Sequence, residues 1–264
     1  MYEFEYRRAR SVADASALIA KTGGKALAGG QSLIAAMKLR LAQPGTLVDL
    51  SGIAELQAIR REGDAVLIGA MTRHADVGSS ETVRRAIPSL AALAEGIGDR
   101  QVRNMGTIGG SIANNDPAAD WPAALVALNA TVVTGKRRIP AGEFFRGMYE
   151  TALADDEIIA AVSFPLPKKA AYAKFPNPAS RFALVGVFVA QLADGSVRVA
   201  VTGAAPAVFR ASGIEAALAA SFTADAAKQV KVDASNLNTD LHASSAYRAH
   251  LVSVMASRAV AACG

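Results

Sequence analysis

The stretch from Asn104 to Trp121 reads Asn-Met-Gly-Thr-Ile-Gly-Gly-Ser-Ile-Ala-Asn-Asn-Asp-Pro-Ala-Ala-Asp-Trp. Its glycines surround Thr107 and Ser111, and a dense group of polar side chains follows them. Glycine lets a backbone approach a ligand closely, and hydroxyl groups among free backbone N–H groups describe a concave anion site. We interpret the stretch as one wall of a nucleotide cofactor site. A Gly/Asn-rich turn between two elements is the structural alternative.

A second glycine-rich turn lies between a short buried strand, predicted at 25–28, and a helix predicted at 33–41. The turn is Gly29-Gly30-Gln31-Ser32. A strand, a glycine turn and a helix in this order aim backbone N–H groups at a phosphate. A helix dipole contributes only about 0.3–1 kcal/mol at an exposed site, so several N–H groups must share the binding. The turn matches neither Gly-x-Gly-x-x-Gly nor a Walker A loop, and an ordinary capped helix is the alternative.

The composition excludes several classes of protein. The chain has 264 residues, of which 52% are hydrophobic and 19% charged, as in a soluble globular protein with one or two domains. One cysteine and three histidines leave no internal disulfide, no cysteine-ligated iron–sulfur cluster and no expected metal site. The net charge of +5 comes from scattered basic pairs, so we expect no nucleic-acid partner. No apolar run is long enough for a membrane span. The N-terminal residues have no signal-peptide core, and we expect a cytoplasmic protein.

The hydrophobic patterns predict alternating helices and strands. A first helix at 11–22 and a strand at 47–50 complete a small β-α-β-α-β unit. Further strands are expected at 65–69, 131–134 and 158–162, the last of them stopped by Pro165. Helices are expected near Met71-Thr72, at 87–97 and at 122–129, with Asp120 as the cap of the last. An Asp194-Gly195 turn predicts a hairpin of 182–192 with 197–202. Alanine-rich helices follow and end in 245–262, with Tyr247, Leu251, Val254 and Val260 inward; 233–242 is expected to be a surface loop.

These elements predict an α+β protein in two parts. We place a first domain at residues 1–175, divided into subdomains of about 1–52 and 53–175. A C-terminal α/β domain with a small antiparallel sheet would occupy 176–264. The two glycine turns fall in different subdomains, which fits a diphosphate held between them.

Taken together, Lys25 to Leu33 and Gln101 to Pro122 resemble the two FAD-binding loops in the medium subunits of molybdenum hydroxylases, the xanthine dehydrogenase family. The resemblance is strongest to carbon monoxide dehydrogenase medium chains and covers essentially the whole chain. It implies a two-subdomain FAD-binding fold of the vanillyl-alcohol-oxidase-like (PCMH) type. It also implies non-covalent FAD as the cofactor.

The resemblance implies a role for each matching position. The first loop would bind the FAD pyrophosphate through its backbone, and the second would complete the pyrophosphate and ribose contacts. Asn114 and Asp120 would hold the ribityl chain, Ile159 would meet the isoalloxazine, and Lys174 would lie near the pyrimidine edge of the flavin. A cation there stabilises the charge of reduced flavin, although an ordinary exposed loop lysine is the alternative. The implied cofactor-binding residues are Lys25, Leu27, Ala28, Gly29, Gly30, Gln31, Ser32, Leu33, Val102, Gly106, Thr107, Gly109, Gly110, Ser111, Asn114, Asp120, Ile159 and Lys174, with no catalytic residue and no metal ligand.

Three positions depart from the pattern of related carbon monoxide dehydrogenase chains. Gln31 stands where they have His, and Ser111 where they have Asn. Both replacements are polar, and the contacts there are expected to come largely from the backbone. The absence of the His also argues against covalent attachment of the flavin. Phe182 stands where relatives often have Tyr, and we expect it to pack.

The resemblance implies an electron-transfer subunit. A large partner would carry the molybdenum cofactor, a small partner would carry [2Fe-2S] clusters, and the assembly is expected to be a dimer of heterotrimers. Electrons would leave FAD for an external acceptor. A self-sufficient FAD oxidase or reductase is the first alternative, and a non-enzymatic nucleotide-binding module is the second.

Overall fold

A computed structural model describes residues 1–263. The N-terminal part is a three-stranded parallel sheet in the order β1-β3-β2, and its elements are β1 (Glu5–Arg8), α1 (Val12–Thr22), β2 (Lys25–Leu27), α2 (Leu33–Lys38) and β3 (Thr46–Asp49). The Ser11 side chain caps α1 by accepting the Asp14 N–H, and Gly23 ends the helix with a φ of 63°. The predicted β-α-β-α-β unit is confirmed. Helix α2 is shorter than predicted and ends at Lys38, ahead of Arg40, which has a φ of 61°.

The middle part is a five-stranded antiparallel sheet in the order β4-β5-β10-β6-β7. Its strands are β4 (Ile59–Glu62), β5 (Ala65–Gly69), β6 (Thr131–Thr134), β7 (Arg138–Pro140) and β10 (Ile159–Pro165). Alternate residues such as Val66, Ile68 and Val162 are buried in the main core, as a sheet with helices on one face requires. Strand β10 runs through Pro165 instead of stopping before it, because a proline is tolerated at the last position of a strand.

Helices cover one face of this sheet. They are α3 (His74–Ser79), α4 (Glu81–Ala86), α5 (Pro88–Glu95), α6 (Arg100–Met105), α7 (Ile108–Asn114) and α8 (Trp121–Ala127); a short η1 (Ala54–Gln57), α9 (Ala141–Phe144) and the hairpin of β8 (Phe145–Gly147) with β9 (Glu150–Thr151) complete this part. The helix predicted near Met71-Thr72 begins only at His74. The reason is that Thr72 and His74 hydrogen-bond to Ile108 and Gly106 instead.

The glycine-rich stretch is more helical than the sequence suggested. Residues 100–105 and 108–114 form α6 and α7, and only Gly106 and Thr107 separate the two helices. Asp99 caps α6, and Thr107 caps α7 by accepting the Gly110 N–H. The alternative of a simple turn is therefore wrong, and Gly109 and Gly110 lie in the first turn of a helix.

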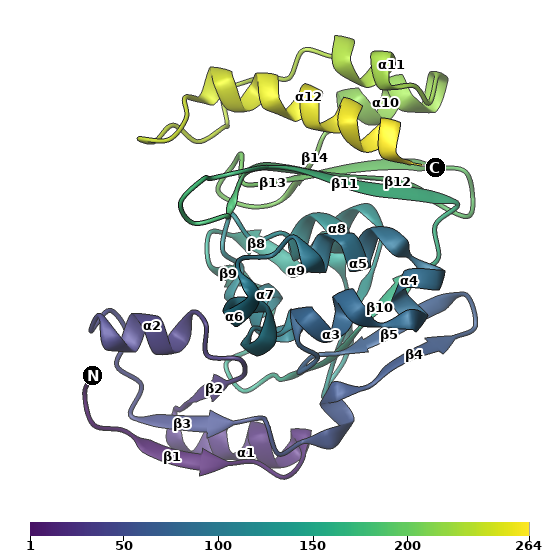
Figure 1. Ribbon diagram of the computed structural model, residues 1–264. Coiled ribbons are helices and arrows are strands. Elements are labelled where there is room, and N and C mark those ends of the chain that lie inside the picture. Colours follow the sequence, from purple (N-terminus) through teal and green to yellow (C-terminus); the bar gives the residue numbers. More distant parts are fainter. Residues whose placement is uncertain (264) are drawn as a thin grey trace.

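The C-terminal part is a four-stranded antiparallel sheet between two helical layers (Figure 1). Its elements are β11 (Lys169–Pro176), β12 (Ala183–Gln191), β13 (Val197–Thr202), β14 (Phe209–Arg210), α10 (Ser212–Ala220), α11 (Ala224–Gln229) and α12 (Ser245–Ala262). Helix α8 packs on one face of the sheet, and α10 and α12 pack on the other. Strand β12 is apolar from Ala183 to Ala190, since Phe188 and Ala190 enter one core while Val187 and Val189 enter the other.

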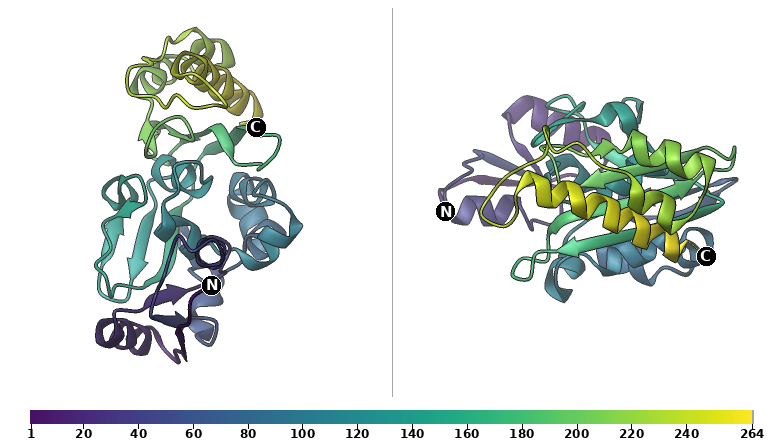
Figure 2. Two further views of the ribbon diagram at one scale, coloured as in Figure 1. Left: turned by 90° about the vertical axis from the view of Figure 1, so that its left-hand side faces the viewer. Right: turned by 90° about the horizontal axis from the view of Figure 1, so that it is seen from above.

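The predicted hairpin through Asp194 and Gly195 is confirmed, with a φ of 89° at Gly195. The inward placement of Tyr247 is wrong, because this side chain is 44% exposed, whereas Leu251 and Val260 are buried as expected. The three parts are stacked as successive tiers, which Figure 2 shows from a second direction. The predicted α+β class, with a small antiparallel C-terminal sheet, is confirmed.

Candidate functional site

The two glycine turns lie against each other. A Cβ atom built on Gly29 would stand 2.8 Å from the Gly106 Cα, and one built on Gly110 would stand 3.4 Å from the Ala28 Cβ. Loops that are about 80 residues apart in the chain therefore share one surface. Gly29 permits this approach because any side chain there would overlap the Met105 carbonyl group.

The first turn presents free donors. The backbone N–H groups of Gly29, Gly30, Gln31 and Ser32 donate no hydrogen bond within residues 1–263. Gly30 has a φ of 73°, and Ser32 forms no side-chain cap on α2. A short run of free N–H groups in such a bend is suited to the oxygens of a phosphate.

The second turn uses most of its N–H groups internally. The Gly109 N–H donates to the Ala70 carbonyl (2.8 Å), the Gly110 N–H to the Thr107 hydroxyl (3.1 Å) and the Ser111 N–H to the Thr107 carbonyl (3.0 Å). In the part of the chain that the structure describes, the Thr107 N–H and the Ser111 hydroxyl have no partner. This turn therefore offers fewer backbone donors than the first.

Asp120 is the centre of a buried polar group at the start of α8. The Tyr172 hydroxyl donates to Asp120 Oδ1 at 2.5 Å, and Lys174 Nζ lies 3.0 Å from Oδ1 and 3.1 Å from Oδ2. Lys174 Nζ also donates to the Gly96 carbonyl at 2.8 Å. The exposed fractions of the two side chains are 4% for Asp120 and 11% for Lys174. Burial raises the pKa of Asp120, and the charge of Lys174 works in the opposite direction.

These contacts correct two expectations. Asp120 makes no capping bond to α8, because its backbone is already helical and its carboxylate is turned toward the C-terminal sheet. Lys174 is not an exposed loop residue but part of β11. Tyr172 and Lys174 are two residues apart on this strand, so both side chains point toward α8.

A hollow of about 490 Å³ opens beside Lys174. Arg103, Arg181 and Asn177 contribute to its lining, and Arg103 is held by the carbonyls of Ile97 and Gly98. Glu95 also lines the hollow, so its border carries one carboxylate beside the two arginines and Lys174. Phe182, expected to pack, is 49% exposed on the neighbouring loop.

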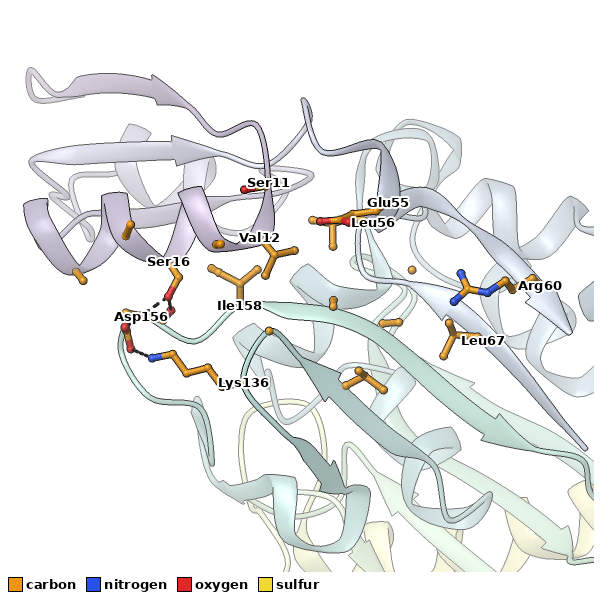
Figure 3. Close-up of a pocket in the computed structure, with 18 residues that line it drawn as sticks. Ser11, Val12, Ser16, Glu55, Leu56, Arg60, Leu67, Lys136, Asp156 and Ile158 are labelled. Carbon is orange, nitrogen blue, oxygen red and sulfur yellow. Dashed lines mark hydrogen bonds and ion pairs between the residues drawn. The ribbon is translucent and has the colours of Figure 1, made fainter. Parts of the chain in front are cut away.

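A groove of about 820 Å³ lies elsewhere, between α1 and the open face of the five-stranded sheet (Figure 3). Ser16 donates to the Asp156 carbonyl at 2.6 Å, and Lys136 pairs with the Asp156 carboxylate at its border. None of the predicted cofactor residues lines this groove.

The remaining predicted residues are placed as follows. Lys25 is exposed on β2 and forms no ion pair among residues 1–263, and Leu27 ends that strand. Leu33 is the first residue of α2, Val102 is half-buried on α6, and Asn114 is the last residue of α7. The Ile159 side chain is buried in the main core, and its backbone pairs with Thr134. The structure thus joins the two loops to each other and Asp120 to Lys174.

Sequence reasoning missed three residues that support this region: Tyr172, Thr202 and His74. The period-two spacing of Tyr172 and Lys174 was a usable signal. His74 donates its backbone N–H to the Gly106 carbonyl at 2.9 Å, and its Nδ1 accepts a hydrogen bond from Trp121 Nε1 at 3.1 Å. Burial, followed by the charge of Arg103, lowers the pKa of His74 to about 4.

A glycine bend with four free N–H groups, set against a second hydroxyl-bearing glycine loop from the middle part, fits a dinucleotide diphosphate. The class of protein is therefore a dinucleotide-binding domain with an appended α/β domain. Residues 2–167 match the family model of the FAD binding domain in molybdopterin dehydrogenase, and residues 170–263 match the CO dehydrogenase flavoprotein C-terminal domain. The chain belongs to this family of FAD-binding flavoprotein subunits.

The chain is similar over nearly its whole length to medium subunits of enzymes that are named for different substrates. It is 38% identical to the carbon monoxide dehydrogenase medium chain of Hydrogenophaga pseudoflava, over 97% of this chain and 96% of the relative. It is 36% identical to the nicotine 6-hydroxylase medium subunit of Paenarthrobacter nicotinovorans, over 98% and 96%. A solved carbon monoxide dehydrogenase from H. pseudoflava superposes with a TM-score of 0.89 at 37% identity, covering 100% of this chain and 99% of that one.

The predicted family, cofactor and enzyme class are confirmed. The chain is an FAD-carrying subunit of a molybdenum hydroxylase, an oxidoreductase complex with further subunits. No helix within residues 1–263 is long and apolar enough to cross a membrane.

Proposed function

We propose that the two glycine loops hold the FAD diphosphate and that this chain is the electron-output subunit of its complex. The observation that carries the proposal is the contact of Gly29 with Gly106, which brings four unpartnered N–H groups beside the second loop. The N–H groups of Gly29 to Ser32 would bind the diphosphate. The Thr107 N–H and the Ser111 hydroxyl would add contacts from the opposite side.

Asp120 would bind hydroxyl groups of the ribityl chain, and Lys174 would lie at the pyrimidine edge of the flavin. The remaining implied contacts would come from Lys25, Leu27, Ala28, Leu33, Val102, Gly106, Gly109, Gly110, Asn114 and Ile159. FAD, when bound, supplies the chemistry of accepting and releasing electrons. Because Asp120 pairs with Lys174, the local charge is close to neutral, and Lys174 is a weaker electrostatic support than an isolated cation.

The proposed partners rest on the family to which the chain belongs and on its medium-chain relatives. Its single cysteine, Cys263, is buried, and residues 1–263 contain no cluster of potential metal ligands. A large subunit would carry the molybdenum cofactor and hydroxylate the substrate, and a small subunit would carry [2Fe-2S] clusters. We propose a dimer of heterotrimers in the cytoplasm, with electrons leaving this chain for an external acceptor. Medium subunits similar to this chain occur in enzymes named for carbon monoxide and for nicotine. This supports the proposal that the substrate binds to another subunit.

Three measurements test this proposal. Purified chain should be yellow, and released FAD should be stoichiometric; a preparation that stays colourless with added FAD would contradict FAD binding. The isolated chain should not turn over a dye with candidate substrates, whereas the complex from its native source should. Dye reduction by the isolated chain would support a self-sufficient FAD oxidase or reductase instead. Mass spectrometry of the co-purified chains would test the two predicted partners.

A further inference from the structure

Three residues form one row across the C-terminal sheet. Lys174 on β11 pairs with Gly186 on β12, and Gly186 pairs with Thr202 on β13. Side chains directly opposite one another on neighbouring strands share a face. Gly186 leaves a gap in the row, and the Tyr172 hydroxyl fills it, since a Cβ on Gly186 would overlap that hydroxyl.

The residues from Pro117 to Asp120, here called the strap, lie on this row and connect α7 with α8. Each of the first three strap carbonyls faces a donor from the C-terminal sheet or its ends. The Gly203 N–H donates to the Pro117 carbonyl at 2.8 Å, and the Ala183 N–H to the Ala118 carbonyl at 3.4 Å.

Thr202 binds the strap next to Asp120. Its Oγ1 lies 2.6 Å from the Ala119 carbonyl oxygen and 3.1 Å from the Pro117 carbonyl oxygen. A hydroxyl has one proton. Because the Ala119 carbonyl is the nearer of the two and the Pro117 carbonyl also accepts from the Gly203 N–H, we assign the donated proton of Thr202 to the Ala119 carbonyl. Only 1% of Thr202 is exposed, so loss of this donor would leave a buried carbonyl without a partner.

We propose that Thr202 is a positioning residue that fixes the carboxylate of Asp120 through the strap. This inference rests on the proposed role of Asp120 in binding FAD. Tyr172 and Lys174 bind the carboxylate itself, whereas Thr202 fixes the peptide group that precedes it. The C-terminal domain thereby shapes one wall of the cofactor site without contacting FAD through Thr202.

Full-length Thr202→Val, Thr202→Ser and a matched control test the proposal. The control is Ser253→Ala, which removes another buried hydroxyl of the same domain; Ser253 Oγ donates to the Val230 carbonyl at 2.6 Å, the same distance as that from Thr202 to Ala119. Helix α12, which carries Ser253, lies on the far side of the C-terminal sheet from α8 (Figure 1). Thr202→Val and Ser253→Ala should lower the thermal unfolding midpoint of the FAD-free chain by similar amounts.

Titration with FAD should distinguish Thr202→Val from Ser253→Ala. Thr202→Val should raise the dissociation constant for FAD at least tenfold. In Thr202→Ser and in Ser253→Ala the dissociation constant should stay within threefold of the wild-type value. A Thr202→Val chain that binds FAD like the wild type would overturn the proposal. So would an equal loss in Ser253→Ala, because the effect would then be one of general stability.

Hydrogen exchange of the FAD-free chain tests the positioning role of Thr202 without any measurement of FAD binding. Peptides that cover residues 116–124 should exchange at least tenfold faster in Thr202→Val than in the wild type or in Ser253→Ala. Unchanged exchange there would refute positioning by Thr202. A wild-type chain that takes up no FAD would instead refute the proposed function, and exchange would still decide whether Thr202 holds the strap.

Discussion

Gly29 lies in the N-terminal part and Gly106 in the middle part, and a Cβ atom on the first would stand 2.8 Å from the Cα of the second. The φ angle of Gly29 is not positive, so an alanine there would be acceptable to the local backbone. Space is the only obstacle. We expect Gly29→Ala to push the loops apart and to weaken FAD binding at least tenfold, a loss of about 1.4 kcal/mol or more.

A matched control is available for that substitution. Gly45 lies in the same subdomain, has no positive φ, and a Cβ there would meet no atom within 4 Å. Gly45→Ala should therefore keep the wild-type dissociation constant in a fluorescence titration with FAD. Gln31→Ala should also be tolerated, because Gln31 is exposed and its backbone N–H is retained. Equal affinities of Gly29→Ala and the wild type would show that loop contact does not govern binding.

The charges at Asp120 and Lys174 should set the reduction potential of the bound flavin in opposite directions. Lys174→Met removes a cation and should lower the midpoint potential, whereas Asp120→Asn leaves Lys174 uncompensated and should raise it. A change of about 1.4 kcal/mol corresponds to about 30 mV for a two-electron couple. Spectroscopic redox titration measures the shift.

The double variant supplies the internal check of this prediction. With both charges removed, the potential should return most of the way to that of the wild type, because the buried pair is close to neutral as a unit. Potentials that move in the same direction for both single variants would rule out an electrostatic role of the pair.

Much of this fold could be read from local patterns. Ser11, Gly23 and the Asp194-Gly195 turn each act on residues next to them in the chain, so the sequence predicted the first helix and the C-terminal hairpin correctly. The apolar run from Ala183 to Ala190 agrees with the burial of β12 on both faces, although only the hairpin was predicted from this segment.

Contacts between distant segments could not be read in this way. Asp120 precedes a helix and so resembles a cap, but partners 52 and 54 residues away bind its carboxylate. The sequence around Gly109 is typical of a loop, but Gly109 lies in the first turn of α7 and donates its N–H to the carbonyl of Ala70. Thr202 has no local signal, since its role depends on strand register and on the path of the strap.

The carboxylate of Glu157 should stabilise the folded state at neutral pH, and this stabilisation should be lost in acid. Its carboxylate accepts from Arg137 Nε and a terminal nitrogen of Arg137 (2.9 Å each), from Thr134 Oγ1 (2.7 Å) and from the Ala154 N–H (3.1 Å). The bond with Arg137 is the main reason that the pKa of Glu157 is lowered to about 2. A lowered pKa stabilises the folded state above about pH 4.5, and this contribution is lost as the pH falls toward 2.

Glu157→Gln should therefore cost about 2 kcal/mol at pH 7, after allowance for the half-exposed Arg137. The difference from the wild type should shrink steadily below pH 4.5 in urea unfolding curves. Glu143→Gln, at an exposed carboxylate in the same part, is the control and should have little effect at any pH. A difference that is constant from pH 7 to pH 3 would contradict the ionised state as the source of the stability.

His74 should make the chain acid-sensitive in a higher pH range. Its pKa is lowered to about 4 by burial and by Arg103, and its Nδ1 must stay unprotonated to accept from Trp121. The unfolded chain binds this proton near pH 6.5, so stability should fall as the pH drops from about 6.5 to about 4. The steepest loss from this group alone is about 1.4 kcal/mol per pH unit. Because the imidazole ring of His74 lies against Gly106 of the second loop, FAD affinity should fall over the same range.

His74→Gln keeps an acceptor for Trp121 but removes the titrating group. Its unfolding free energy should be lower than that of the wild type at pH 7.5, and the gap should narrow or reverse by pH 4.5. Urea unfolding followed by fluorescence suits this test, because Trp121 is the one tryptophan of the chain and is fully buried. His242→Gln, at an exposed site, should keep the wild-type pH dependence. If His74→Gln and the wild type lose stability in parallel between pH 6.5 and pH 4.5, His74 is not the group that makes the fold acid-sensitive.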